Sequence, residues 1–282
     1  MKKIVAILMI VAMMFTLLVS CDSALKDEDL DDLPAEEEEE NKKDKEDSKK
    51  KTEELLQKAD EVLAKTAYKV IMKTSFKAED KNLDAALAAN AMEIPIIIDG
   101  ENISMDMSMP ALGVDRSTIV VVDKVLYMLV ESNGNTVKYK CSLTQEQFEK
   151  FMAENNVTMP IEYKYFNEKK VKTDDDSKII SCSKLNQAGK DMLKERAKNL
   201  LQNMGNDSEP AYDEIELELV VKDSKYVSQK IEMDYSITAQ GQKFNVSSIT
   251  SSRYDYSEEY KVVLPEDADT YTEVDYGILF PG

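Results

Sequence analysis

The chain has 282 residues, of which 36 are lysine or arginine and 55 are aspartate or glutamate, and its formal net charge is −19. It contains no histidine, no tryptophan and three cysteines. The lack of histidine excludes a Ser-His-Asp triad, a Cys-His dyad and a histidine-ligated zinc or copper site. Such a negative charge disfavours nucleic-acid binding, which needs a cationic face. We therefore expect no enzyme, no metal site, no cofactor and no nucleic-acid partner.

The first 21 residues have the features of an export signal. Lys2 and Lys3 precede an apolar run, Ile4–Val19, that is shorter than the roughly 20 residues a membrane-spanning helix needs. The run ends in Leu18-Val19-Ser20-Cys21, which resembles the lipobox of bacterial lipoproteins. The resemblance implies that residues 1–20 are a signal peptide and that Cys21 carries the lipid anchor, on the extracytoplasmic side of the cell membrane. The alternative is an ordinary cleaved signal, or a short anchor, with an incidental cysteine.

Residues 22–51 contain 14 acidic and 7 basic side chains and almost no apolar ones. Because such a segment cannot bury enough surface to offset its ordering entropy, we expect it to be disordered. Its charges are acidic through Glu40 and rich in lysine from Lys42 to Lys51. We interpret residues 21–51 as the lipidated cysteine and a solvated tether. Contact of the lysine block with anionic lipid or wall polymer is the alternative.

Residues 52–282 contain no Pro- or Gly-rich linker, so we expect a single domain. Thr52–Thr66 has the apolar stripe of an amphipathic helix. From Tyr68 the period changes to two, with Val70, Met72 and Phe76 on one face and lysines on the other, which predicts a half-buried strand. Asp99-Gly100 separates two apolar runs, Ile94–Ile98 and Asn102–Met109, and predicts a hairpin.

The remaining elements follow from the same patterns. Predicted strands and helices are Thr118–Val122, Val125–Glu131, Thr136–Leu143 after an Asn133-Gly134 turn, a helix with a Thr144/Gln147 capping box, Lys178–Ser183, a helix from Asn186, and a closing meander of Glu214–Val221, Tyr226–Thr238, Lys243–Tyr256 and Lys261–Leu264. In the Tyr226–Thr238 strand, Val227 and Ile231 are placed on the apolar face. Together these elements predict an α+β fold in which about three helices cover the apolar side of an antiparallel sheet.

This order of elements is similar to bacterial lipoproteins of the LolA/LppX-like type, including uncharacterised Gram-positive ones. The closing stretch Val246–Val274, with Tyr254-Asp255-Tyr256 and Val263–Ala268, looks like the ending of that group. The resemblance implies a strongly curved antiparallel sheet, an open half-barrel, with its helices on the concave or mouth side. It also implies binding of acyl chains or of lipoproteins.

Met105, Met107 and Met109 alternate along one predicted strand. Alternate residues of a strand lie about 6.6 Å apart, so three thioethers on a regular strand cannot close around one metal ion. We interpret them as core residues or as a deformable lining, and the sequence leaves both interpretations open. Together with Val70, Met72 and Phe76 they are the candidate lining of a hydrophobic ligand site.

Cys141 and Cys182 each end a predicted strand just before a helix. Export makes a disulfide between them permissible, and in the chain-entropy model it would contribute about 4 kcal/mol. The alternative is two buried small hydrophobic residues.

The sequence thus predicts a lipid-anchored extracytoplasmic protein that binds a hydrophobic ligand, an acyl chain or lipid, inside a curved sheet. The alternative is a structural or protein-interaction lipoprotein of the cell surface, with a solid core, a protein partner and no ligand.

Overall fold

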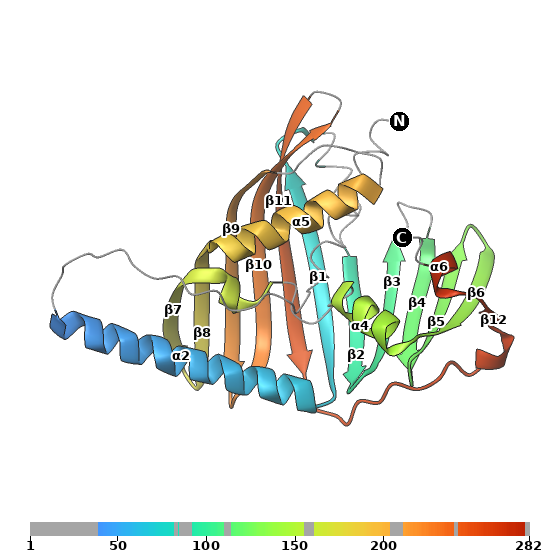
Figure 1. The fold of residues 1–282 in the computed structure, drawn as a ribbon, viewed down its shortest axis with the longest axis horizontal. Helices are drawn as coiled ribbons and strands as arrows, with labels where there is room; N and C mark the ends of the chain where they lie inside the picture. The colour runs from blue at the N-terminus through green and yellow to red at the C-terminus, as the bar shows by residue number, and fades with distance from the viewer. Residues whose placement is uncertain are drawn as a thin grey trace.

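The computed structural model describes residues 39–81, 84, 92–109, 114–154, 161–203, 211–239 and 242–279. The predicted signal peptide, the lipobox with Cys21 and most of the tether lie outside these residues. Within these residues, all the strands belong to one 12-stranded sheet (Figure 1). No helix in this part of the chain is both long and apolar enough to cross a membrane.

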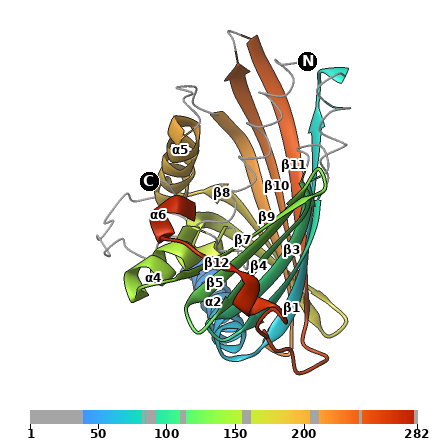
Figure 2. The same cartoon turned by 90° about the vertical axis from the view of Figure 1, so that its right-hand side faces the viewer.

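The strands lie in the order β12-β6-β5-β4-β3-β2-β1-β11-β10-β9-β8-β7. Neighbours pair antiparallel, except that β12 pairs parallel with β6. The sheet is curved and does not close, so β7 and β12 are its edges (Figure 2). The predicted curved, open antiparallel sheet is confirmed. The strands are β1 (Tyr68–Ala78), β2 (Met92–Asp99), β3 (Asn102–Met109), β4 (Val114–Val122), β5 (Val125–Ser132), β6 (Asn135–Ser142), β7 (Phe166–Asp174), β8 (Ser177–Leu185), β9 (Ala211–Lys222), β10 (Lys225–Ala239), β11 (Gln242–Asp255) and β12 (Thr272–Glu273).

β1 lies in the middle of the sheet and joins two meanders. It pairs with β2, which begins the β2–β6 meander, and with β11, which ends the β7–β11 meander. The predicted turns hold: Gly100 has φ +61° between β2 and β3, and Asn133 and Gly134 have φ values of 50° and 75° between β5 and β6. Both central residues of the β5–β6 turn thus have positive φ, whereas in the β2–β3 turn only Gly100 does; both patterns occur in two-residue hairpin turns.

The first helix is longer than predicted. α2 (Glu39–Lys65) begins within the segment predicted to be a disordered tether, so that prediction is wrong for residues 39–51. Glu39 and Glu46 each precede a lysine by four residues, a spacing that favours helix formation even without apolar content. Figure 1 shows the N-terminal end of α2 projecting past β7. Its C-terminal half packs on the sheet through Leu56 and Ala59, which are fully buried.

The other helices are α4 (Gln145–Glu154), α5 (Gln187–Asn203) and the short α6 (Tyr276–Leu279), with 3-10 turns η2 (Tyr163–Tyr165) and η3 (Ala268–Thr270). The capping box that begins α4 is formed as predicted. The Thr144 backbone N–H donates to Gln147 Oε1 at 2.9 Å, and the Gln147 N–H donates to Thr144 Oγ1 at 3.1 Å.

Replacing Thr144 with alanine is expected to lower the free energy of unfolding by about 1 kcal/mol, because one helix N–H loses its side-chain acceptor. Urea unfolding followed by circular dichroism measures the change. Ser142→Ala is the matched control, since Ser142 is an exposed hydroxyl residue two positions away. Equal stability of the two variants would show that the capping box contributes nothing.

The buried residues of α2, α4 and α5 pack against the same face of the sheet, which we call the inner face. The larger buried cluster joins Leu56 of α2 and Leu193 of α5 to inner-face residues of β1–β3 and β8–β11. The smaller cluster joins Phe148 and Phe151 of α4 to Val121, Leu126, Cys141 and Leu143. Cross-strand pairing of Ile103 with Val121 shows that the two clusters lie on the same face.

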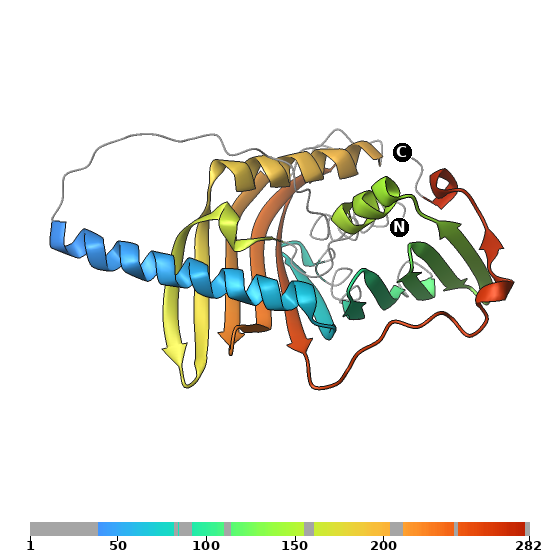
Figure 3. The ribbon, with the colours of Figure 1, turned by 60° about the horizontal axis from the view of Figure 1, so that its bottom comes forward.

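The C-terminal segment corrects one predicted strand and covers one sheet edge. Lys261–Leu264 is not a strand and pairs with none in the described part of the chain. The segment runs from β11 past β2–β5 to β6 (Figures 1 and 3), where the Val274 N–H donates to the Lys140 carbonyl at 2.9 Å. Tyr271 packs edge-on against Tyr127, with ring centroids 5.5 Å apart. This segment therefore covers the edge of β6, which would otherwise be free to pair.

Candidate functional site

Four of the six predicted lining residues are buried in the larger cluster on the inner face. Val70, Met72 and Phe76 lie on β1, and Met105 lies on β3. Met107 is half-buried and packs against the same cluster. Met109 pairs through its backbone with Val114, and its side chain lies outside the described residues. The sheet thus places the five described side chains on one face, with β2 between the two strands.

The inner face of β3–β6 is less completely covered than that of β7–β11. Residues that pair across β3–β6 form rows on this face. The row that contains Cys141 is buried beside α4, and the next two rows, farther from α4, contain accessible apolar side chains. Val137 is 40% exposed; in its row Val130 and Met107 are half-buried, and the polar Ser117 between them is buried. We call this set the apolar patch; it consists of Met107, Ile119, Met128, Val130, Val137 and Tyr139. Of these, only Met107 was predicted as lining.

Asp60 is a polar centre at the edge of the larger cluster. It lies on α2, next to Ala59, and accepts hydrogen bonds from the hydroxyls of Tyr226 on β10 at 2.6 Å and of Tyr163 in η2 at 3.0 Å. The Tyr226 ring packs against Tyr254, with centroids 6.0 Å apart. Sequence reasoning missed this centre, although an aspartate beside the apolar stripe of an amphipathic helix was a usable signal.

The electrostatics of Asp60 follow from its position. Burial raises its pKa above the usual 3.8, and the hydrogen bonds from Tyr226 and Tyr163, which favour the carboxylate, offset only part of that rise. Burial also raises the pKa of both tyrosines, and their bonds to Asp60 add to the effect. The tyrosines therefore remain protonated donors at neutral pH, and the three side chains fasten α2 to β10 and η2.

The two cysteines do not form the predicted disulfide. Cys141 and Cys182 are free thiols, buried in the smaller and the larger cluster respectively. They lie on β6 and β8, near opposite ends of the strand order, so the bridge is absent for a topological reason. Burial raises the pKa of Cys182 to about 11 and also raises the pKa of Cys141, which keeps both sulfurs in the unreactive thiol form at neutral pH.

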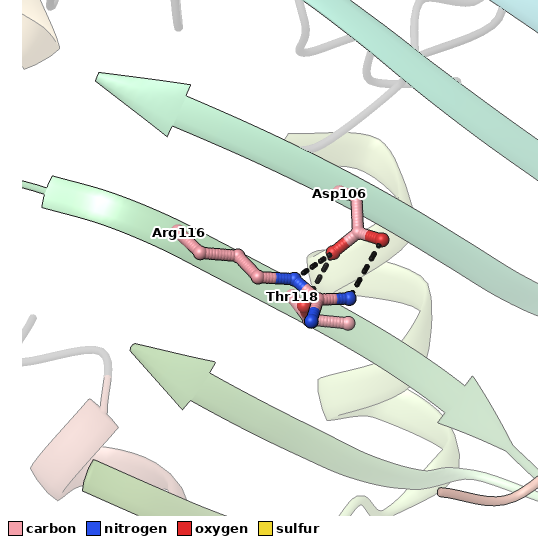
Figure 4. Close-up of polar contacts among 3 residues, drawn as sticks. All are labelled: Asp106, Arg116 and Thr118. Carbon is pink, nitrogen blue, oxygen red and sulfur yellow. Dashed lines mark hydrogen bonds and ion pairs between the residues drawn. The ribbon is translucent and has the colours of Figure 1, made fainter. Parts of the chain in front are cut away.

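An ionic group on the outer face joins β3 to β4 (Figure 4). Arg116 donates from Nε and an Nη atom to the two carboxylate oxygens of Asp106, at 3.2 and 3.1 Å, and Thr118 donates to the same carboxylate. Partial burial raises the pKa of Asp106, but the bonds from Arg116 and Thr118 outweigh it and lower the pKa overall. The group spans the part of the β3–β4 pairing where the register shifts.

Arg116→Lys is expected to lower the free energy of unfolding by less than about 1 kcal/mol, because lysine cannot reproduce the bidentate contact but the pair is half exposed and screened. The difference from the wild type should shrink at about 1 M salt, where the Debye length is near 3 Å. Chemical unfolding at low and high salt measures both effects. A larger, salt-independent loss would mean that the group is a packing element.

In the described residues, no three histidine, cysteine, aspartate or glutamate side chains cluster in a way that would hold a metal ion. The strongest feature of the site is therefore apolar: the patch on β3–β6, beside a solid cluster that Asp60 and its tyrosines border. The sequence matches no protein-family model and no curated protein.

Proposed function

We propose that this protein is a lipid-anchored extracytoplasmic binding protein that holds an acyl chain or lipid inside a half-barrel whose concave side is covered by its helices. The observation that carries the proposal is the apolar patch. Val137 is 40% exposed, and half-buried Met107, Ile119, Met128, Val130 and Tyr139 continue the accessible surface. A patch of this kind on the helix-bearing face of a curved sheet suits an apolar ligand.

Methionine makes the patch adaptable. Met128 of β5 pairs with Ile119 of β4, and Met107 of β3 pairs with Ser117, the next inner-face residue of β4. Their unbranched thioether side chains can repack around ligands of different shape. The lipobox-like sequence ending at Cys21 supports the proposed anchor, since a diacylated cysteine holds a protein on a membrane far more firmly than one acyl chain.

The test is native mass spectrometry of the full chain, extracted from its own membrane in mild detergent. We expect the wild type to retain a non-covalent acyl lipid in addition to the lipid on Cys21. Met107→Glu places a charge in the patch and should reduce retention at least about tenfold, equivalent to 1.4 kcal/mol. Ser108→Glu is the matched control, because it adds the same charge at an exposed neighbouring position that faces the other side of the strand.

A specific observation favours the alternative function. The larger cluster is packed solid at many positions, and Val70, Ile96 and Ile103 are fully buried. A protein that works only through its acidic exterior would need no more than this core. A wild-type mass equal to the lipidated chain alone, with no uptake of added lipid, would contradict ligand binding and favour a surface-interaction role.

A further inference from the structure

One polar side chain lies in the middle of the apolar patch. Ser117 of β4 pairs with Met107 of β3 on one side and with Val130 of β5 on the other. The next inner-face residue along its own strand is Ile119, which also belongs to the patch. The Ser117 side chain therefore projects from the inner face among hydrocarbon and thioether groups, and the residue is only 8% exposed.

The hydroxyl of Ser117 has no partner of its own. Among the described residues, no group forms a hydrogen bond with it. Its strand neighbour Thr118, by contrast, donates to Asp106 on the outer face. Natural proteins satisfy nearly all polar groups that are this buried, because an unsatisfied one loses its hydration and gains nothing in return. A ligand on the patch with a hydrogen-bond acceptor can complete this hydroxyl, which has one proton to donate.

The cations of β3–β6 all lie on the outer face. Within the described residues, the basic side chains of these strands alternate with inner-face neighbours: Arg116, Lys138 and Lys140. Arg116 is paired with Asp106, and Lys138 is paired with Asp267 of the C-terminal segment. The inner face of these four strands therefore offers no cation to hold the carboxylate or phosphate of an anionic ligand.

Carboxylates, by contrast, lie at two sides of the patch. Asp115 is exposed at the bulge that ends the β4–β5 pairing, two residues from Ser117. Glu273 of β12 and Asp275 lie at the edge of β6, close enough to Cys141 to add to the rise that burial causes in the pKa of its thiol. These charges repel an anionic headgroup, as does the net charge of −19, so an uncharged acceptor fits the patch better.

We propose that Ser117 is the polar anchor of the apolar patch: its hydroxyl donates a hydrogen bond to the carbonyl of an uncharged acyl ester whose chain lies over the patch. The inference rests on the proposed function and adds the ligand class, an acyl ester in preference to a hydrocarbon or a fatty-acid anion. One donor serves one carbonyl oxygen. The row that contains Ser117 crosses four strands, about 14 Å, so a chain that starts at Ser117 can cover Val130 and Val137.

The test compares methyl palmitate with heptadecane and palmitate, each displacing the fluorescent hydrocarbon diphenylhexatriene from the full chain in mild detergent, at an alkaline pH that ionises palmitate. The wild type should bind the ester about fivefold more tightly than the alkane, the gain expected of one neutral hydrogen bond, and also more tightly than palmitate. Ser117→Ala should lose the preference for the ester over the alkane. Ser108→Ala is the matched control, since it removes an exposed hydroxyl on the other face of β3, and it should keep the preference.

A second variant tests the carboxylates. Asp115→Asn/Asp275→Asn should bind palmitate at least about twofold more tightly than the wild type at low salt, and the gain should vanish at about 1 M salt, where exposed charges are screened. Binding of the uncharged ester should not change. An unchanged palmitate affinity would show that the carboxylates do not select the ligand, and would overturn that part of the assignment.

The outcomes separate this inference from the proposed function. Equal binding of ester and alkane by the wild type, tighter binding of palmitate, or an ester preference that survives in Ser117→Ala overturns the anchor and leaves the proposed function standing. Failure of all three compounds to displace the probe, together with no retained lipid in the native mass, overturns the proposed function itself. Ser117→Ala should fold, because the hydroxyl it removes has no partner to lose, and the wild-type comparison does not depend on it.

Discussion

Replacing Asp60 with alanine is expected to lower the free energy of unfolding by about 2 kcal/mol, because it leaves the hydroxyls of Tyr226 and Tyr163 without their shared acceptor. Tyr226 is fully buried, so water cannot replace Asp60 as the acceptor for its hydroxyl. The loss should fall on the docking of α2, which contacts β10 through this group and through Leu56. Chemical unfolding gives the total, and hydrogen exchange of the α2 amides locates it.

Asp60→Asn is the matched control for this change. The amide keeps one oxygen that accepts from a tyrosine and offers N–H groups to the other, so its cost should be less than half that of alanine. Equal losses for the two variants would show that the carboxylate charge, and not the hydrogen bonding, holds the helix.

The wild type and Asp60→Asn should also differ in how their free energy of unfolding depends on pH. Burial raises the pKa of Asp60 above 3.8, so the folded protein binds this proton more tightly than the unfolded chain does. The stability that the group contributes is fully present below pH 3.8 and is lost as the pH rises through its raised folded pKa. The unfolding free energy of the wild type minus that of Asp60→Asn should therefore fall as the pH rises through this window and then level off. A difference that grows with pH would contradict the raised pKa.

Much of the sheet could be predicted because its signals are local. Gly100, Asn133 and Gly134 take the positive φ values of tight hairpins, and the lysines of β1 alternate with a buried face. The capping box at Thr144 formed for the same reason, since every group it needs lies within four residues.

The features that the sequence did not predict have two causes. A charged strand has the composition of a loop, and some contacts join residues that are distant in sequence. β7 is an edge strand paired only with β8 in the described residues, so its run of lysines is solvated and gave no apolar alternation. Val227 was placed on the apolar face of its strand, but a bulge between Tyr226 and Ser228 leaves it exposed. The bond between Asp60 and Tyr226 spans 166 positions and is set only by the fold.

Some residues of the candidate site could likewise be identified from the sequence, and others could not. The inner-face residues of β1 were identifiable because one strand shows its own alternation, and Met105 and Met107 follow the same rule on β3. The patch residues Ile119 and Met128 were not, because the near-continuous apolar runs of β4 and β5 do not reveal which side chains face inward until the strands are paired.

Gly189→Ala is expected to lower the free energy of unfolding by about 2 kcal/mol, although alanine favours helix over glycine by about 1 kcal/mol. Gly189 lies in the first turn of α5, and a Cβ there would come within 2.9 Å of both the Cβ and the carbonyl oxygen of Tyr165 in η2. The close approach is fixed by Asn186, which accepts from the Gly189 N–H at 2.8 Å and donates to the Lys164 carbonyl at 2.9 Å.

Gly277→Ala is the matched control, since it is also a helical glycine and a Cβ there would have no atom within 4 Å. It should leave stability unchanged or raise it by up to about 1 kcal/mol. Urea unfolding of both variants decides between propensity and packing: if Gly189→Ala also stabilises, α5 is not held against η2.

Because η2 binds Asp60 of α2 through Tyr163 and contacts Gly189 of α5 through Tyr165, the two substitutions should not act independently. In the double variant Asp60→Ala/Gly189→Ala, the second change is made to an η2 that the first has already released. The summed single losses should therefore exceed the double loss by at least about 0.5 kcal/mol. Strict additivity would mean that α2 and α5 attach to the sheet separately, and that η2 is only a connection between them.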